Sequence, residues 1–427
     1  MARLLAIFLP CMLALSGCQD SQGGGDSGTE SGGDGGWTID NPPRVAFTDE
    51  TLPRMEAPSD ESTWVDTPKP LAEIGEDTNE QGILYSAHLM GHYQMRMLDE
   101  EEGFHYEYDP TDDSFNETGS VHRKVVSTFS LTWLYKLTRR DEYRFAVEHM
   151  LRFLEDDADE QADGSLKLRD LGATAMFAMA LSHHAKYTGT TEWDDTIDKV
   201  GAHVLSLVNE DGSLNNGSPL YYAQAHLGIW RLYDYTQDEI YLDTLETVGK
   251  FHYDNRDNSD YLDSKHLYAL WAHEPLTELY MLRPADWITE FVFENADSVL
   301  RGQYTPDSED VEERLIGSFK ESEDERRWRV VLKLEGTIDA YRLAKFVGDE
   351  ARTEAYRKGA LLAVKFLQEF QYRKGDTAGW PVPPRAVGGT PYGFDHPIVR
   401  IEVPGHEVNG FAKVVEYMDL EDYPGHP

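Results

Sequence analysis

The sequence contains almost no cysteine. Its two cysteines, Cys11 and Cys18, both lie near the N-terminus of a chain of 427 residues. A disulfide framework is therefore excluded, and so is a cysteine-ligated metal site in the rest of the chain. We expect neither a metal ion nor a cofactor.

Basic residues are also scarce. The chain has 39 lysines and arginines against 78 acidic residues, which gives a net charge of −39. The phosphates of a nucleic acid would be repelled by such a surface, so we expect no nucleic-acid partner. An anionic polymer would need a local basic site. A solvated acidic surface is the simplest explanation of the charge.

Only the N-terminus carries a long apolar run, and the run from 4 to 15 is too short to span a membrane. It follows Arg3 and ends in the stretch 15–18, Leu-Ser-Gly-Cys. This stretch resembles the lipobox of bacterial lipoproteins. The resemblance implies a signal peptide over residues 1–18, cleavage before Cys18, and a lipid on its sulfur.

In that family, the residue after the cysteine influences the destination, and Gln19 in place of aspartate favours the outer membrane. We therefore expect a protein of the cell envelope, anchored in the membrane through lipidated Cys18, on the periplasmic side or at the cell surface. An ordinary signal peptide with a chance cysteine is the alternative.

Three further segments follow the signal peptide. Residues 19–36 are rich in Gly, Ser and Asp and cannot bury apolar surface, so we expect a flexible tether. Residues 37–81 are rich in Pro, Asp and Glu, and we expect an extended arm lying on the domain. Residues 82–427 form the folded domain.

A helical hairpin at 130–154 is the repeating unit of this domain. Apolar residues three or four apart, such as Trp133 and Leu137, define one helix face, and Val147 and Leu151 continue the pattern after a short polar turn. The same kind of turn recurs at 187–193, 235–241, 282–287 and 346–351. A period of about fifty residues indicates a repeat architecture.

The periodicity predicts twelve helices, at 83–98, 120–137, 141–156, 170–187, 191–208, 219–235, 238–253, 265–282, 285–301, 328–347, 350–371 and 405–418. Short turns follow the even-numbered helices and long segments follow the odd-numbered ones. All long segments should therefore lie on one face. Helix 170–187 is apolar nearly all round, which indicates that the even helices are buried. The predicted fold is all-α, an (α/α)6 toroid of six helical hairpins.

At this point the chain resembles the six-hairpin glycosidase-like proteins, which include the N-acylglucosamine and cellobiose epimerases and the C-terminal part of glucuronyl carbon-5 epimerases. Arg123 matches the Arg of an Arg-His-Ala-Gly motif, although Lys124 and Val126 depart from it. Glu335 has a similar Leu-Glu context, and 388–406 resembles the family's tail. The resemblance implies a saccharide or uronic-acid-like ligand and an epimerase, hydrolase or lyase.

The N-terminal ends of the even helices should meet at the long-loop face, where their partial positive charge suits carboxylates and developing anions. The catalytic candidates there are the carboxylates and imidazoles that can exchange a proton: Glu335, Glu402, His406 and His266. We expect Arg400 and Glu402 on one side of an extended segment, and His406 at the start of the last helix.

The candidates for ligand binding are paired donors, amides and aromatic platforms: Arg123, Arg400, Phe104, Tyr106, Tyr222, Gln224, Trp271, Trp328 and Trp380. Phe104 and Tyr106 alternate along one loop, where they would line one side of an extended segment, and they could equally pack on the ring. Relatives often carry Glu at the position of Gln224. The amide of a glutamine cannot transfer protons as that carboxylate can.

Two classes of function stay open. The convergence of carboxylate and histidine over 400–407 favours an enzyme acting on a carbohydrate. The departures at Lys124, Val126 and Gln224 favour a lipoprotein that binds a glycan or protein without catalysis. The fold alone does not decide, because toroids carry unrelated chemistries.

Overall fold

The computed structural model describes most of the domain. It covers residues 80–99, 103–116, 118–215, 219–256, 265–320, 327–373, 375–393, 396–418 and 420, without the side chains of 80–81, 219–220, 265–270 and 327–328. The predicted signal peptide, tether and most of the arm therefore lie outside the described residues. Within the described part, no helix combines the length and the apolar character needed to cross a membrane.

The twelve predicted helices are present. They are α1 (Glu80–Arg96), α2 (Val121–Thr138), α3 (Asp141–Asp156), α4 (Leu171–Thr188), α5 (Asp194–Ser206), α6 (Pro219–Thr236), α7 (Glu239–Asp254), α9 (Lys265–Leu282), α10 (Asp286–Arg301), α11 (Arg327–Val347), α12 (Glu350–Phe370) and α14 (Glu402–Tyr417). A short helix, α13 (Pro383–Ala386), and a 3-10 turn, η4 (Glu313–Leu315), were not predicted.

The last helix begins earlier than its sequence indicates. The predicted start was residue 405, whereas α14 begins at Glu402. Pro404 and Gly405 look like helix breakers, but a proline is tolerated in the first turn, where its missing N–H would have no intrahelical partner. Glu402 is therefore a helical residue, and the expectation of an extended segment holds only for Arg400 in strand β7 (Val399–Arg400).

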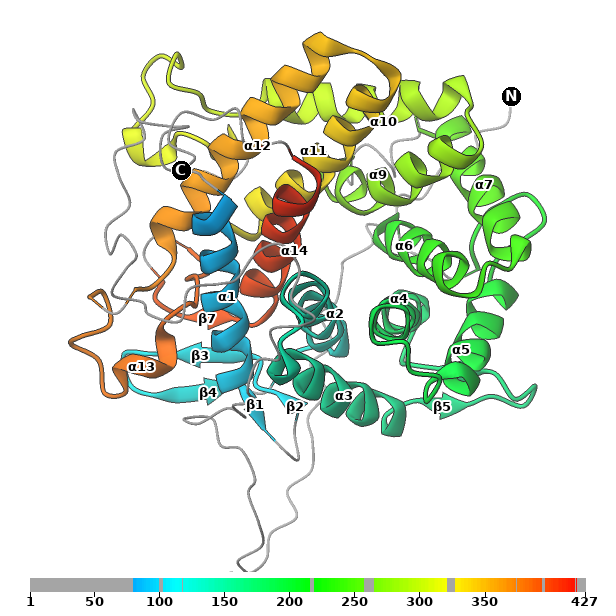
Figure 1. The fold of residues 1–427 in the computed structure, drawn as a ribbon, viewed down its shortest axis with the longest axis horizontal. Coiled ribbons are helices and arrows are strands. Elements are labelled where there is room, and N and C mark those ends of the chain that lie inside the picture. Colours follow the sequence, from blue (N-terminus) through cyan, green and yellow to red (C-terminus); the bar gives the residue numbers. More distant parts are fainter. Residues whose placement is uncertain are drawn as a thin grey trace, which may run out of the picture. The chain divides into compact units, whose positions relative to one another are not determined.

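Six of the described helices form a closed inner ring. Each contacts the next in the order α2, α4, α6, α9, α11 and α14, and α14 contacts α2 again. The helices α1, α3, α5, α7, α10 and α12 pack outside them. Figure 1 shows α2 and α4 almost end-on, with α3 and α5 on their outer side. This arrangement confirms the predicted (α/α)6 toroid.

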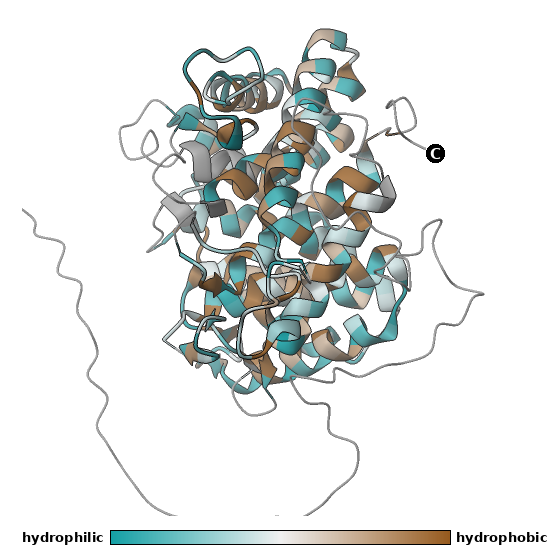
Figure 2. Ribbon diagram, turned by 90° about the vertical axis from the view of Figure 1, so that its left-hand side faces the viewer, coloured by the Kyte–Doolittle hydropathy of each residue, from teal (hydrophilic) through white to brown (hydrophobic). Residues whose placement is uncertain are grey.

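Burial follows the two rings. Every residue of α4 from 171 to 185 is buried, whereas α3 buries one face that includes Tyr143, Val147 and Leu151. Figure 2 shows hydrophobic and hydrophilic residues alternating along many helices, as expected where one face packs inward. Small residues allow close approach in the inner ring: a Cβ on Gly228 of α6 would lie 2.5 Å from the carbonyl oxygen of Ala175 in α4.

The first and last long connections meet at one face of the ring. Strands β3 (Glu107–Asp109), β4 (Ser114–Asn116) and β7 form a small antiparallel sheet in the order β4-β3-β7. In its register Glu107 lies opposite Arg400, and Tyr108 opposite Val399. Two further short hairpins join β1 (Leu98–Asp99) to β2 (Gly103–Phe104) and β5 (Asp159–Glu160) to β6 (Leu166–Lys167). The sheet places residues from opposite ends of the domain beside the mouth of the ring.

Candidate functional site

A cavity of about 600 Å³ opens where the inner helices begin. Its lining comes from the first two turns of all six inner helices and from the last long connection: Ser120, His122, Arg123, Val126, Asp170, Met176, Tyr221, Gln224, Trp271, Leu332, Tyr392, Arg400, Glu402 and His406. The up-down topology brings these residues together because all six helices run in the same direction through the ring. The size is typical of small-molecule sites.

One carboxylate and two arginines form the polar centre of the α2–α14 side. Oε1 of Glu402 lies 3.1 Å from Nε of Arg123 and 3.0 Å from Nη2 of Arg400. Arg123 also donates from Nη1 to the Tyr106 hydroxyl at 2.6 Å. Arg400 forms an ion pair with Glu107 at 3.5 Å across the β3–β7 register. Two positive and two negative side chains therefore balance one another.

Glu402 is 9% exposed, and its second oxygen, Oε2, is buried with no hydrogen-bond partner among the described residues. Burial raises the pKa of this carboxyl group, and Arg400 and Arg123 oppose that rise without cancelling it. The cavity therefore presents a buried acceptor atom that a ligand can satisfy.

A histidine–carboxylate pair occupies the α11–α14 side. Nδ1 of His406 lies 3.0 Å from Oε1 of Glu335, and both side chains are buried. An ionised carboxylate only accepts, so Nδ1 donates and the lone pair of the neutral ring lies on Nε2. The ring of Trp271 lies 5.8 Å from the imidazole, tilted by 31°. Glu335 is not among the residues that line the cavity, and this hydrogen bond holds the imidazole of His406, which does line it.

A second histidine–carboxylate pair lies on the α2–α4 side of the ring, and our sequence interpretation missed it. Nε2 of His122 lies 2.9 Å from Oδ1 of Asp170, and the imidazole stacks on Tyr221 at 5.6 Å. Asp170 is also the N-cap of α4, accepting from the amide of Ala173. Burial would raise the pKa of Asp170, but the hydrogen bonds from His122 and Ala173 leave it lowered. The sequence signal that could have identified His122 as a site residue was its position directly before Arg123.

Several expected ligand-binding aromatic residues do not line the cavity. Phe104 is fully buried in the core, and Tyr106 is 6% exposed between the two arginines. Tyr222 packs on His252 at 4.6 Å, and Trp380 packs on Tyr372 at 4.8 Å. Phe104, Tyr106 and Trp380 have protein partners because their long connections fold back onto the domain, and Tyr222 packs between helices α6 and α7. Among the expected binding residues, Arg123, Arg400, Gln224 and Trp271 do line it.

Two other candidates cannot be placed as side chains. His266 lies in the first turn of α9 and Trp328 in the first turn of α11, and both side chains lie outside the described residues. In the described part of the chain, no three His, Cys, Asp or Glu side chains come together as metal ligands. His273, beside Glu274, instead donates from Nδ1 to the carbonyl of Gly336 at 2.9 Å.

A buried ion cluster lies deeper in the ring than the cavity. Nζ of Lys413, two turns beyond His406 on α14, lies 2.8 Å from Glu274 of α9 and 2.7 Å from Asp339 of α11. Arg231 of α6 pairs with Glu274 as well. Burial would raise the pKa of Glu274, but Arg231 and Lys413 hold it well below its usual value. The cluster ties four inner helices together.

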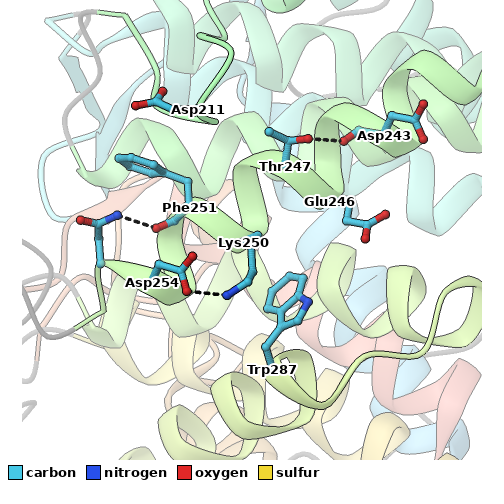
Figure 3. A pocket seen from close by; sticks show the side chains of 9 residues that line it. Asp211, Asp243, Glu246, Thr247, Lys250, Phe251, Asp254 and Trp287 are labelled. Carbon is cyan, nitrogen blue, oxygen red and sulfur yellow. Dashed lines mark hydrogen bonds and ion pairs between the residues drawn. The ribbon is translucent and has the colours of Figure 1, made fainter.

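A second cavity, of about 630 Å³, lies on the outer ring beside α7. Figure 3 shows Lys250 paired with Asp254, at 2.5 Å, with Glu246 and Asp243 farther along the same helix. The ammonium group of Lys250 is therefore already paired, and the other polar side chains that line this cavity are mostly acidic. This cavity offers no group positioned for catalysis, so the inner cavity is the candidate site.

No family model and no curated protein matches the sequence. Solved structures do match the fold. A D-mannose isomerase has a TM-score of 0.58 at 14% identity, covering 80% of this chain and 98% of its own. Cellobiose 2-epimerase from Bacillus thermoamylovorans has a TM-score of 0.57 at 11% identity, covering 76% and 95%.

An inactive variant of the GH76A α-1,6-mannanase of a Salegentibacter species, in complex with α-1,6-mannotetrose, has a TM-score of 0.56 at 12% identity, covering 78% of this chain and 99% of its own. At such identities the likeness establishes architecture and not activity. The chain therefore has the same (α/α)6 toroid fold as these solved structures.

Proposed function

We propose that the cavity binds a saccharide and moves a proton at the carbon next to its carbonyl group, as a sugar isomerase or epimerase does. The observation that carries this proposal is the His406–Glu335 pair, with one ring nitrogen held by a buried carboxylate at 3.0 Å. A neutral imidazole fixed in this way is a usable base near pH 7.

The reaction follows from the groups at the site. His406 Nε2 takes the proton from carbon 2 of the open-chain sugar, and the electrons of that C–H bond pass to the carbonyl oxygen through an enediolate. Return of the proton to carbon 1, with the hydroxyl proton moving from oxygen 2 to oxygen 1, gives the ketose. Rotation of the enediolate relative to His406 exposes the other face of carbon 2, and return of the proton to that face gives the epimer. The N-termini of the inner helices stabilise the negative charge that develops on the oxygen.

The solved structures with this fold support a sugar as the ligand. Three of them are a mannose isomerase, a cellobiose epimerase and a mannanase bound to a mannose oligosaccharide. The cavity fits a mono- or disaccharide by volume, and Trp271 offers an aromatic surface to sugar C–H groups.

Glycoside hydrolysis is the second candidate. Two carboxylates of the cavity have pKa values displaced in opposite directions, raised for Glu402 and lowered for Asp170. Such a difference assigns an acid and a base. It ranks second because Oε1 of Glu402 is held by two arginines, which compete with proton donation.

Product analysis by NMR tests the function. The protein is incubated with neutral monosaccharides and disaccharides and with uronic acids. The proposal expects a new ketose or epimer with every glycosidic bond intact. New reducing ends from a disaccharide would favour hydrolysis instead. Binding without any product would favour the non-catalytic glycan-binding alternative.

We also propose that the protein is anchored in the envelope membrane through a lipid on Cys18. The support is the apolar run followed by Leu-Ser-Gly-Cys. We expect Cys18→Ala to move the protein from the membrane to the soluble fraction, because stable anchoring needs the lipid chains. Cell fractionation with immunoblotting measures this, with Cys11→Ala as the matched control. A Cys18→Ala protein that stays membrane-bound like the wild type would refute the anchor.

A further inference from the structure

The two arginines of the cavity are engaged by a carboxylate of the protein itself. Arg123 and Arg400 come from α2 and β7, and both direct an N–H group at the same oxygen, Oε1 of Glu402, at 3.1 Å and 3.0 Å. Their guanidinium groups also contact Tyr106, through its hydroxyl and its ring, and Arg400 contacts the ring of Tyr392 and the carboxylate of Glu107. This is the arrangement by which two arginines would hold the carboxylate of an acidic ligand.

Two buried acceptor atoms of the cavity are left for a ligand, beside one donor, Nε of Arg400, which faces Glu107 at 3.5 Å. Oε2 of Glu402 and Oε1 of Gln224 are both buried without a hydrogen-bond partner among the described residues. The two side chains line the cavity and are 9% and 3% exposed. Sugar hydroxyl groups can donate to both atoms, whereas a carboxylate or phosphate has no proton to donate at neutral pH.

We propose that Glu402 is a resident carboxylate that occupies the Arg123–Arg400 pair and restricts the cavity to neutral sugars. The selection of sugars rests on the proposed function, whereas the occupation of the arginine pair does not. Glu402 is covalently fixed beside both arginines, so a free anion must compete against a high effective concentration. A uronate would also meet the Glu402 charge. Of the two ligand classes expected from the sequence, saccharides and uronic-acid-like sugars, the proposal keeps only the neutral saccharides.

Propionate tests the occupation of the arginine pair. Its carboxylate and the adjoining CH₂ group match the two carbons that Glu402→Ala removes. Calorimetric titration with sodium propionate, at ionic strength matched with sodium chloride, should give a dissociation constant at least about tenfold lower for Glu402→Ala than for the wild type. Equal affinity for the two proteins would show that the arginines are open in the wild type and would overturn the proposal.

Matched sugar pairs test the selectivity. The wild type should bind D-glucose and D-mannose at least about tenfold more tightly than D-glucuronate and D-mannuronate. Glu402→Gln keeps the side-chain volume but removes the charge. The ratio of neutral-sugar affinity to uronate affinity should therefore fall at least about tenfold, in favour of the uronates. Glu402→Gln also serves if Glu402→Ala fails to fold. A wild type that prefers the uronates would contradict the proposal.

Glu416→Gln is the matched control. It makes the same substitution at the other end of α14, where Glu416 pairs with Lys136 at 2.7 Å, and it should keep the wild-type preference. The two proposals can fail separately. Neutral-sugar binding without turnover removes the proposed function and leaves the role of Glu402 intact. Turnover of a uronate by the wild type would contradict the role of Glu402 and leave the proposed reaction intact. If no sugar binds, the propionate titration still decides whether the arginines are occupied.

Discussion

Replacing His406 with alanine is expected to lower kcat for the sugar substrate by at least about 100-fold, or about 2.7 kcal/mol of barrier. The imidazole is the cavity's base in the proposed reaction, and in the described part of the chain Glu335 is its hydrogen-bond partner. A group that acts in the transition state affects kcat more than KM. Steady-state kinetics on the sugar identified by product analysis measures the change.

Glu335→Gln is expected to lower kcat by about tenfold or more, because an amide can accept from Nδ1 but no longer stabilises the imidazolium. Glu416→Gln, on the same helix as His406 but paired with Lys136, should keep the wild-type rate. If His406→Ala and Glu335→Gln both stay within about threefold of wild type, under about 0.7 kcal/mol, these residues are structural. A binding protein would then replace the enzyme.

Lys413→Met is expected to lower the free energy of unfolding by about 3 kcal/mol. The ammonium group is 2.8 Å from Glu274 and 2.7 Å from Asp339, and all three side chains are buried. Without it, the two carboxylates face each other with one fewer compensating charge. Arg231 still pairs with Glu274 and Arg342 with Asp339, which limits the loss.

Urea unfolding followed by circular dichroism measures this change. Lys199→Met is the matched control, because Lys199 forms an exposed pair with Asp195 at 2.8 Å on helix α5. Such surface pairs contribute little, so the control should change stability by less than about 1 kcal/mol. If Lys413→Met is no more destabilising than Lys199→Met, the buried cluster does not hold the inner helices together.

The ring could be predicted from the sequence because the patterns that encode it are local. Helix periodicity, the short turns and the unequal connections together fixed the inner and outer helices and the face of the long segments. The start of α14 could not be predicted in the same way. Pro404 and Gly405 suggest a break, and only the structure shows that the helix begins before them, at Glu402.

The site could be predicted in part. Its general place followed from the direction of the helices, and Arg123, Arg400, Glu402 and His406 line one cavity. The partners could not be predicted, because they depend on how the ring closes: Glu335 and His406 are 71 residues apart, and His122 and Asp170 are 48 apart. For the same reason, the sequence did not show that Phe104 is buried in the core.

Hydrogen exchange at carbon 2 of the sugar tests the central claim most directly. The reaction is run in D₂O and followed by proton NMR, with the wild type and with His406→Ala. We predict that the wild type loses the carbon-2 hydrogen and incorporates deuterium as the product forms, at carbon 2 of an epimer or carbon 1 of a ketose, because a proton held on an imidazole exchanges with solvent. His406→Ala should do so at least about 100-fold more slowly. Equal exchange in both proteins, or product formed with every carbon-bound hydrogen retained, would contradict proton transfer by His406.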